Sequence, residues 1–511
     1  MVMDPNAPCI VGVARNTWHP QDVGDAGAPE PLDMWEQMAR AAADDSGVGA
    51  SALEALDSVQ IVYCQTTQYD DAVARLCERI GASPSHRYYS GIGGTTPQVL
   101  VDWVGEAMLR GELDCALVTG AEALATQRMY NKRGEKCAYS YRPEEKRPYP
   151  WEWPPDPIEI AHEAMQAWLN FSVFDNARRA HLGMGLDDYR TAIGELMAPM
   201  TEIAAKSPHA WYPIARTASE IAEARPDNRM VGYPYTKYMI SVMDVDMASA
   251  LLLMTHAKAD ELGVPADQRV YLRGWCYLND PVLVAGHDEM WRSPAMQAAS
   301  GEAMRVAGIS TDDVKYLDVY SCFPSSVHFA RDALGMTADD PRPLTLTGGL
   351  PYHGGPASNY LGHSISAAVE HLRADAGSYA MVSGVGMHMT KHVYGVYSTE
   401  PGPVSPPDPG AQAALDAAHP ARPVAAEHEG KGTVAAYSVV HGREAGPEWA
   451  LLIVDIGDGN GDGTRTYAKS TDPELLAASE ARELVGETVT LAPTTTALLT
   501  GGEGTMNLAT I

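Results

Sequence analysis

The amino-acid sequence predicts an α/β fold made of two similar halves, interrupted by an inserted segment and followed by a smaller β-rich domain. Three observations lead to this prediction. One succession of strands and helices occurs twice, roughly 260 residues apart. Residues 125–240 interrupt it, and the Pro-rich stretch STEPGPVSPPDPGAQ separates the last part of the chain. Because strands alternate with helices in each half, we expect mostly parallel sheets covered by helices.

The duplicated unit is visible in two pairs of segments. Residues 51–81 and 310–335 each contain a capped helical turn, a β-branched strand ending at Tyr and Cys, and a helix closed by Gly. Residues 93–124 and 354–387 each contain a Gly pair, a loop, a helix, and a strand written CALVTG or YAMVSG. At this point, two unrelated α/β domains that look alike by chance remain the alternative.

The composition of the chain divides it into five parts. The insertion is richer in Trp, Tyr, Pro and charge than its surroundings, and we expect helices and loops that cover the active face. The predicted parts are an N-terminal half (1–124 and 241–262), an inserted loop domain (125–240), a C-terminal half (263–398), a Pro-rich linker (399–425) and a C-terminal domain (426–511).

The C-terminal domain is predicted to be a small β-barrel of the oligonucleotide/oligosaccharide-binding (OB) type. TVAAYSVVHG, EWALLIVDIG and TRTYAKS are typical of strands. A helix is expected from Asp472 as N-cap and Pro473 as first residue to Gly486, and ETVTLAP is the expected last strand. Three strands, a helix and a further strand suit a partly open barrel.

The turn DGNGDG in this domain resembles half of a calcium-binding loop. Asp458, Asn460 and Asp462 have the required spacing, but Lys469 stands where a bidentate Glu is needed. Asp-Gly and Asn-Gly steps are also typical of hairpin turns. We therefore predict a turn and no metal site.

The charge and the cysteines limit the classes of partner and the compartment. With 66 acidic against 37 basic residues, the formal charge of −29 argues against nucleic acid and anionic membranes as partners. The seven cysteines are scattered without CxxC spacing, which is typical of free thiols in a reducing cytoplasm. Neither a signal peptide nor an apolar run of about 18 residues is present, so we expect a soluble cytoplasmic protein without membrane insertion.

A local basic cluster lies in the insertion. Arg133, Lys136 and Arg142 stand close together in NKRGEKCAYSYRPEEKRPYP. Such side chains can hold a phosphate or pyrophosphate by charge-assisted hydrogen bonds. A solvated loop, balanced by Glu135 and Glu144, is the alternative.

The segment 93–124 has the layout that normally presents a nucleophilic cysteine, yet it contains none at the expected place. A Gly-rich turn opens an amphipathic helix, and an apolar strand follows. A cysteine at such a helix start would gain thiolate character from unpaired N–H groups and the helix dipole. Gly94 stands there instead.

The duplicated unit resembles the thiolase superfamily over roughly residues 5–398. The resemblance is carried by PCIVGVARNTWHP, GELDCALVTGAEAL, MASALLLMTHAKADELG, DVYSCF, YLGHS and VSGVGM. The segments GGLPYHGGPASNYLGHSI and VGYPYTKYM resemble type-1 thiolase-like proteins, relatives of the sterol-carrier-type thiolases that carry an extra C-terminal barrel-like domain. The resemblance implies a duplicated βαβαβαββ fold with an inserted loop domain.

The resemblance also implies a role for four positions. Thiolases act on acyl-CoA thioesters, and their nucleophilic cysteine aligns with Gly94. The histidine of their GHP motif aligns with His363, although Ser364 replaces the proline. The Asn or His that polarises the thioester aligns with Tyr320, and the acid/base cysteine aligns with Ser383. We expect a lowered pKa for His363 at its helix start, and either hydrogen-bond donation or acid/base action from Tyr320.

The implied function is chemistry on an acyl-CoA thioester without a covalent acyl-enzyme. Backbone N–H groups near Gly94 and Gly386, together with His363 and Tyr320, would stabilise a thioester enolate, as C–C bond formation or cleavage requires. Overall similarity alone would suggest an acetyl-CoA acetyltransferase. Thr95 or Thr96 as substitute nucleophile, a non-catalytic CoA-binding protein, and a scaffold without ligand remain alternatives; Cys322 is expected to pack behind the site.

We expect acyl-CoA as the small-molecule partner and no bound cofactor. Thiolases usually dimerise through the first half, and the extra domain could cover that surface. A monomer and a thiolase-type dimer are therefore both compatible with the sequence.

Overall fold

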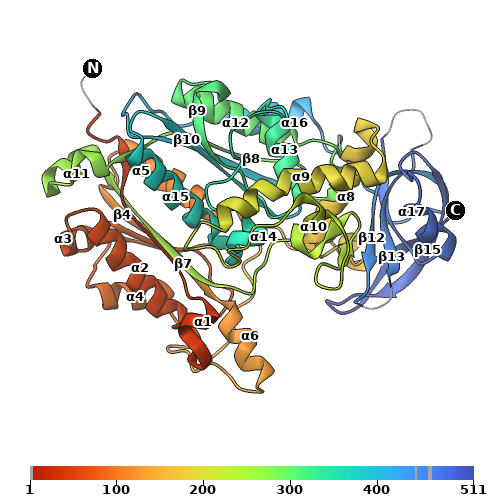
Figure 1. The fold of residues 1–511 in the computed structure, drawn as a ribbon, viewed down its shortest axis with the longest axis horizontal. Coiled ribbons are helices and arrows are strands. Elements are labelled where there is room, and N and C mark those ends of the chain that lie inside the picture. Colours follow the sequence, from red (N-terminus) through yellow and green to blue (C-terminus); the bar gives the residue numbers. More distant parts are fainter. Residues whose placement is uncertain (1–3, 444–445, 458–462) are drawn as a thin grey trace.

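A computed structural model describes residues 4–443, 446–457 and 463–511. It contains an α/β body with a nine-stranded sheet and a C-terminal part with a seven-stranded sheet (Figure 1). Residues 458–462, with the calcium-like turn, lie outside the described residues. Among the described residues we find no helix with the length and hydropathy of a membrane-spanning segment.

The nine-stranded sheet has the order β3-β2-β4-β7-β1-β8-β11-β10-β9. Its strands are β1 (Pro8–Thr17), β2 (Ser58–Ile61), β3 (His86–Tyr89), β4 (Cys115–Ala123), β7 (Asp246–Thr255), β8 (Val270–Asn279), β9 (Val314–Asp318), β10 (Tyr379–Gly386) and β11 (Lys391–Ser398).

The duplication predicted from the sequence is visible in this order. β1 and β8 meet in the centre as a short antiparallel pair. Outward from β1, β7 and β4 are antiparallel to their inner neighbours and β2 is parallel to β4. On the other side of the centre, β11 is antiparallel to β8, β10 is antiparallel to β11, and β9 is parallel to β10. The two halves therefore repeat one plan, which β3 extends at the edge of the first.

Helices α5 (Thr96–Leu109) and α15 (Tyr360–Ala374) hold equivalent places, each directly before the strand that carries CALVTG or YAMVSG. They pack against each other in a core cluster that includes Leu100, Val104 and Ile365, as their apolar spacing requires. Other helices cover the outer faces of the two halves: α2 (Pro31–Asp45), α3 (Ala50–Glu54), α4 (Ala72–Ile80), α11 (His256–Leu262), α12 (Pro294–Ala307) and α13 (Pro324–Ala333). The short helix α1 (Pro20–Val23) follows β1 and has no buried residue.

The insertion contains helices and loops, as expected, and in addition two short strands. β5 (Met230–Gly232) pairs with β6 (Tyr235–Thr236) and with Val440 of the C-terminal sheet. Three residues are too few to show an alternation in the sequence, so this pairing was not predicted. The helices of the insertion are α6 (Leu124–Lys132), α7 (Pro157–Ala161), α8 (Ala167–Leu182), α9 (Leu186–Ala204) and α10 (Ala218–Ala222).

The C-terminal part contains a closed ring of strands in the order β12-β13-β14-β16-β15, because β12 pairs with both β13 and β15. The strands are β12 (Gly430–His441), β13 (Pro447–Asp455), β14 (Arg465–Ser470), β15 (Thr488–Ala497) and β16 (Glu503–Thr510). The last of these was not predicted.

Helix α17 (Pro473–Ser479) lies in the chain between β14 and β15, the third and fourth strands of this part in sequence order, as expected. The predicted N-cap is confirmed, because Asp472 accepts a hydrogen bond from the Glu474 N–H at 3.0 Å. The expected helix end at Gly486 is wrong. α17 ends at Ser479, and the segment up to β15 is irregular.

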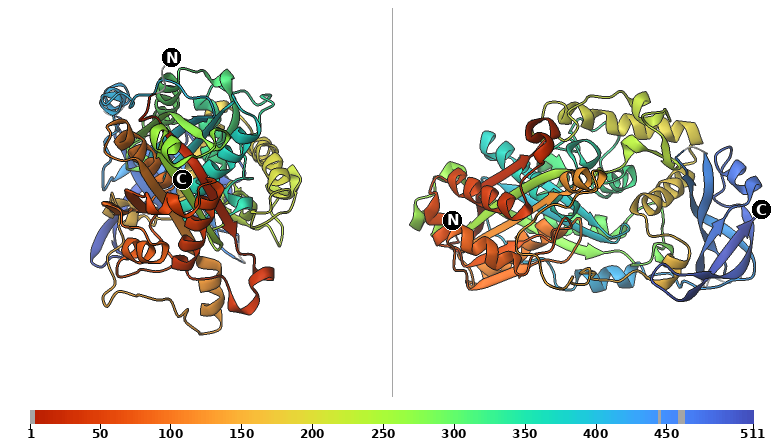
Figure 2. Two further views of the ribbon diagram at one scale, coloured as in Figure 1. Left: turned by 90° about the vertical axis from the view of Figure 1, so that its left-hand side faces the viewer. Right: turned by 90° about the horizontal axis from the view of Figure 1, so that it is seen from below.

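The ring lies at one end of the long axis of the molecule and is attached to the body through the insertion (Figure 2). Arg179 of α8 is 1 % exposed and donates to Glu483 at 2.7 Å. The Pro-rich linker contains helix α16 (Ala411–Ala418), whose Gln412 side chain bonds both backbone groups of Asn279. The first contact joins the C-terminal part to the insertion, and the second holds the linker on the body.

Candidate functional site

The turn before α5 and the segment after β9 meet at Gly94. A Cβ atom built on Gly94 would lie 2.1 Å from the Val385 carbonyl oxygen and 2.3 Å from the Tyr320 hydroxyl oxygen. Both distances are far below van der Waals contact, so no side chain fits at position 94 without a shift of its neighbours. The Tyr320 phenol fills the space that a side chain at this position would occupy.

Tyr320 is held by β10. Its backbone N–H donates to Ser383 Oγ at 3.0 Å, and its ring meets the ring of Tyr360 edge-on at 5.6 Å between centroids. Ser383 thus positions Tyr320. Burial raises the pKa of Tyr320 well above its usual value, so the hydroxyl stays protonated and can donate. Acid/base action, which would need a lowered pKa, is not supported.

Gly386 lies on the other side of the same turn. Its Cβ position is 3.6 Å from the backbone nitrogen of Gly94. That N–H donates no hydrogen bond to any residue the structure describes. The turn at Gly94, the residue Tyr320 and the β10 segment from Ser383 to Gly386 are therefore neighbours, although these three parts are far apart in the sequence.

His363 lies in the first turn of α15 and is completely buried. Neither ring nitrogen has a hydrogen-bond partner within the described chain. Burial, followed by the nearby His353 and Arg15, lowers the pKa of His363 well below its usual value. The direction agrees with the expectation from the sequence, but the largest cause is desolvation.

A second histidine connects His363 with Tyr320. His353, at the end of α14 (Leu350–His353), meets the His363 ring at 5.2 Å and the Tyr360 ring at 6.0 Å between centroids. Tyr360 in turn contacts Tyr320. The four rings form a continuous buried row from the turn at Gly94 to α15.

Three further groups surround this row of rings. Arg15 of β1 donates to the His363 carbonyl oxygen at 3.5 Å and pairs with Glu370. His209 lies on the same side, and burial lowers its pKa to about 4. The Trp211 N–H donates to the His353 carbonyl oxygen at 2.8 Å. The insertion therefore covers the site from this side.

Lys391 adds a buried cation beside the turn. Its side chain is 4 % exposed, pairs with Glu152 of the insertion, and lies over the Trp153 ring at 4.9 Å. Its ammonium nitrogen is 3.9 Å from the Cβ position of Gly93.

Sequence reasoning missed four residues of this site. Lys391 and His209 lie in no motif, and Arg15 lies in the expected opening strand PCIVGVARNTWHP, which gave no sign of a role for its side chain. The roles of all three depend on contacts between distant segments. His353 stands in the Gly-rich motif PYHGGPA, which could have drawn attention to it.

The cysteines do not supply a thiolate near the turn. Cys322 is 7 % exposed, and burial raises its pKa to about 12. Its thiol donates to Ser326. It packs in the core, as expected.

The predicted basic cluster lies elsewhere. Arg133 pairs with Asp25 at 2.7 Å, Arg142 donates to the carbonyl oxygen of Cys137, and Lys136 is exposed. No contact within the described chain joins these three side chains to the row of rings. The alternative of a solvated, charge-balanced loop therefore fits their surroundings better than a phosphate site.

Comparison with known proteins identifies the relatives of this fold. The family model described as "Thiolase-like protein type 1 additional C-terminal domain" matches residues 411–496. A monomeric SCP2-thiolase like protein type 1 from Mycobacterium smegmatis is 31 % identical over 100 % of both chains, with a TM-score of 0.84. No match is found among curated proteins.

Two thiolases share the fold of the body. Acetyl-CoA acetyltransferase from Syntrophomonas wolfei is 15 % identical, with a TM-score of 0.55, over 77 % of this chain and 100 % of its own. The dimeric peroxisomal thiolase of Saccharomyces cerevisiae is 14 % identical, also with 0.55, over 78 % and 98 %. The resemblance stated from the sequence is confirmed: the chain belongs to the SCP2-thiolase-like proteins of type 1.

Proposed function

We propose that this protein binds an acyl-CoA thioester and stabilises its enolate, making or breaking a C–C bond without a covalent acyl-enzyme. The observation that carries this proposal is the position of the Tyr320 hydroxyl, which fills the space of a side chain at Gly94 beside an N–H group without a partner in the described chain. The resemblance stated from the sequence implies that the nucleophile of thiolases would stand at this place. A hydrogen-bond donor replaces it.

Two hydrogen-bond donors border this site. The protonated phenol of Tyr320 and the N–H of Gly94 would both donate to a thioester oxygen. Lys391 and Arg15 are buried cations near the site, each paired with a partly exposed carboxylate, Glu152 or Glu370, so they would add a partly compensated positive potential. One such donor typically changes the rate by about 10²- to 10³-fold.

The neutral imidazole of His363 supports proton transfer in a cleavage reaction. It would accept the proton of a β-hydroxyl group, after which the Cα–Cβ bond breaks and Cβ becomes a carbonyl carbon. The electron pair moves into the thioester as an enolate, whose oxygen accepts hydrogen bonds from Tyr320 and Gly94. The imidazolium then returns the proton to Cα, and the reverse sequence forms the bond.

Substitute nucleophiles receive no support from the geometry. Thr95 and Thr96 are 3 % and 9 % exposed, and neither hydroxyl bonds to a histidine within the described chain. Without a base in contact, a threonine hydroxyl is a weak nucleophile. Cys322 lacks thiolate character, because burial raises its pKa to about 12.

The second candidate is a CoA or acyl-CoA binding protein without turnover. The complete burial of His363 favours it, because a substrate must reach the imidazole for proton transfer. The two candidates share a ligand and differ in chemistry.

Calorimetry with CoA and acyl-CoAs, followed by product analysis over hours, separates them. We expect binding and turnover in the wild type and in Cys322→Ala, and loss of turnover in His363→Ala and Tyr320→Phe. Binding with unchanged thioesters would support the second candidate. A fully active His363→Ala protein would refute the first, and absence of both binding and turnover would refute both.

We also propose that the protein is a monomer. The segment 139–151 of the insertion lies against the first half: the Asp70 N–H donates to the Tyr141 carbonyl oxygen, and Arg75 lies over the Tyr141 ring at 4.4 Å. The similar type-1 protein is described as monomeric.

A further inference from the structure

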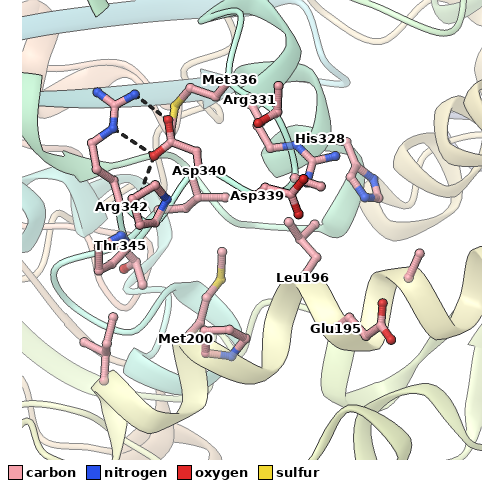
Figure 3. Close-up of a pocket in the computed structure, with 18 of the residues that line it drawn as sticks. Glu195, Leu196, Met200, His328, Arg331, Met336, Asp339, Asp340, Arg342 and Thr345 are labelled. Carbon is pink, nitrogen blue, oxygen red and sulfur yellow. Dashed lines mark hydrogen bonds and ion pairs between the residues drawn. The ribbon is translucent and has the colours of Figure 1, made fainter. Parts of the chain in front are cut away.

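A cavity of about 700 Å³ lies between α9 of the insertion, α13 of the second half and residues 336–345 (Figure 3). One part of its wall is apolar and includes Leu182, Met184, Leu196, Met200, Met336 and Leu344, whereas eight charged side chains and His328 stand among the other lining residues. No residue of the row of rings lines it. It is therefore a different place from the site at Gly94.

Arg331 brings an unpaired cation to this cavity. It lies in the last turn of α13, and its Nε is buried without a partner. Within the described chain, no hydrogen bond or ion pair reaches its guanidinium, since neighbouring Asp332 pairs with Arg178 at 2.8 Å. A guanidinium stays charged at neutral pH and presents a fork of donors that matches a carboxylate.

His328 lies three residues before Arg331 and thus on the same face of the helix. It is 3 % exposed, and its Nδ1 is 3.0 Å from Asp175 Oδ1. Asp175 also accepts from the Tyr189 hydroxyl at 2.6 Å. The Tyr189 hydroxyl is also 3.3 Å from Nδ1. The Asp175 carboxylate favours the tautomer with the proton on Nδ1, in which Nε2, which has no partner within the described chain, is an acceptor at the cavity wall.

The remaining charges favour a ligand with a single negative charge. Arg178 and Arg342 also line the cavity, and each is paired with an aspartate, Asp332 or Asp340. Glu195 and Asp339, both labelled in Figure 3, and Glu202 line it as exposed side chains, against one exposed cation, Lys206. The carboxylates would repel a multiply charged anion such as a phosphate ester, whereas Arg331 can neutralise one carboxylate. The volume falls in the range of small-molecule sites, about 300–1,000 Å³.

We propose that this cavity binds a small amphipathic carboxylate, with the carboxylate on Arg331 and an aliphatic body against the methionine and leucine side chains. A hydroxyl group on such a ligand would donate to His328. This site adds to the proposed function and does not depend on it.

Titration of the full-length protein with [1-¹³C]decanoate, followed by carbon NMR and calorimetry, tests this proposal. We expect saturable one-to-one binding with a shifted carboxyl resonance, weakened at least about tenfold in Arg331→Gln, because the lost bond is charge-assisted. Arg305→Gln, a change at an exposed arginine paired with Glu302, is the matched control and should bind as the wild type does. Leu196→Trp fills the cavity, keeps the charge and should also abolish binding.

The comparison ligands are decanol and inorganic phosphate, both of which should bind at least about tenfold more weakly. Equal affinity for decanol, unchanged affinity in folded Arg331→Gln, or absence of saturable decanoate binding in the wild type would overturn the proposal. If Arg331→Gln does not fold, unchanged binding by Leu196→Trp would overturn it instead. Unchanged acyl-CoA binding in both variants is expected, which keeps this test separate from that of the site at Gly94.

Discussion

At the scale of single residues, the site depends on two positions that share one volume. A side chain at position 94 and the phenol of Tyr320 cannot both be present without a shift, because a Cβ at Gly94 would overlap the Tyr320 hydroxyl. Replacing Gly94 by cysteine alone therefore cannot create a thiolase nucleophile. The two positions are sterically coupled, so a substitution at one changes the space available at the other.

The first prediction concerns the stability of Gly94→Ala. We expect the free energy of unfolding to fall by about 1–3 kcal/mol, as for other overpacked cores. In a Tyr320→Ala background the same change should cost less, because one of its two overlaps is relieved. Urea unfolding measures all four proteins of this cycle.

The matched control is Gly301→Ala. Gly301 lies exposed within α12, and a Cβ there meets nothing within 4 Å. This change should be neutral or stabilise by about 0.5–1 kcal/mol. Equal effects of the two glycine changes would contradict the overlap.

The second prediction concerns the pH dependence of stability. His363 has a lowered pKa in the folded state against about 6.5 when unfolded. Its contribution is therefore complete above about pH 6.5 and is lost as the pH falls below it, because the unfolded chain takes up the proton. His363→Gln should flatten the decline of unfolding free energy between pH 6 and 5 by about 1 kcal/mol per pH unit. Urea unfolding at pH 7, 6 and 5 checks it, and an unchanged slope would mean that His363 is not neutral in the fold.

At the scale of elements, helices of the insertion connect the ring of strands to the α/β body. α8 has one buried arginine in contact with the ring, and β5 pairs with β12. The C-terminal part is thus joined through a segment near the middle of the chain as well as through its linker.

The third prediction tests this junction. Glu483→Ala leaves the buried guanidinium of Arg179 without its carboxylate, which should lower the free energy of unfolding by about 2 kcal/mol. Glu487→Ala breaks an exposed pair with Arg482 and should change it by less than about 1 kcal/mol. Similar losses in both variants would show that the junction contributes little to stability.

At the scale of the whole molecule, the sequence predicts the architecture well because the architecture is repeated. The segments containing Gly94 and His363 occupy equivalent places in the two halves, so the repeat alone places their helices. It does not reveal the contacts of Arg15, His209 and Lys391, because each joins segments that are distant in the chain. The pairing of β5 was missed because its three residues are too few to show an alternation. The basic residues near Arg133 were grouped by sequence proximity alone.

The fourth prediction is the mass of the particle in solution. Light scattering coupled to size exclusion should give the mass of one chain, 54.8 kDa. The variant Tyr141→Ala loses the contact between Arg75 and the Tyr141 ring, which holds segment 139–151 against the first half. Its mass in solution shows whether this contact is needed to keep the protein monomeric. A wild-type mass of twice this value would contradict the proposed monomer.

The central claim is that the site at Gly94 and Tyr320 stabilises an enolate. The most direct measurement is the incorporation of deuterium at the α-carbon of acetyl-CoA in D₂O, followed by mass spectrometry. We predict exchange above the protein-free rate in the wild type, and a rate about 10²-fold lower in Tyr320→Phe, since the phenol is the lost donor. Binding of acetyl-CoA without exchange, or equal exchange in Tyr320→Phe, would contradict the claim.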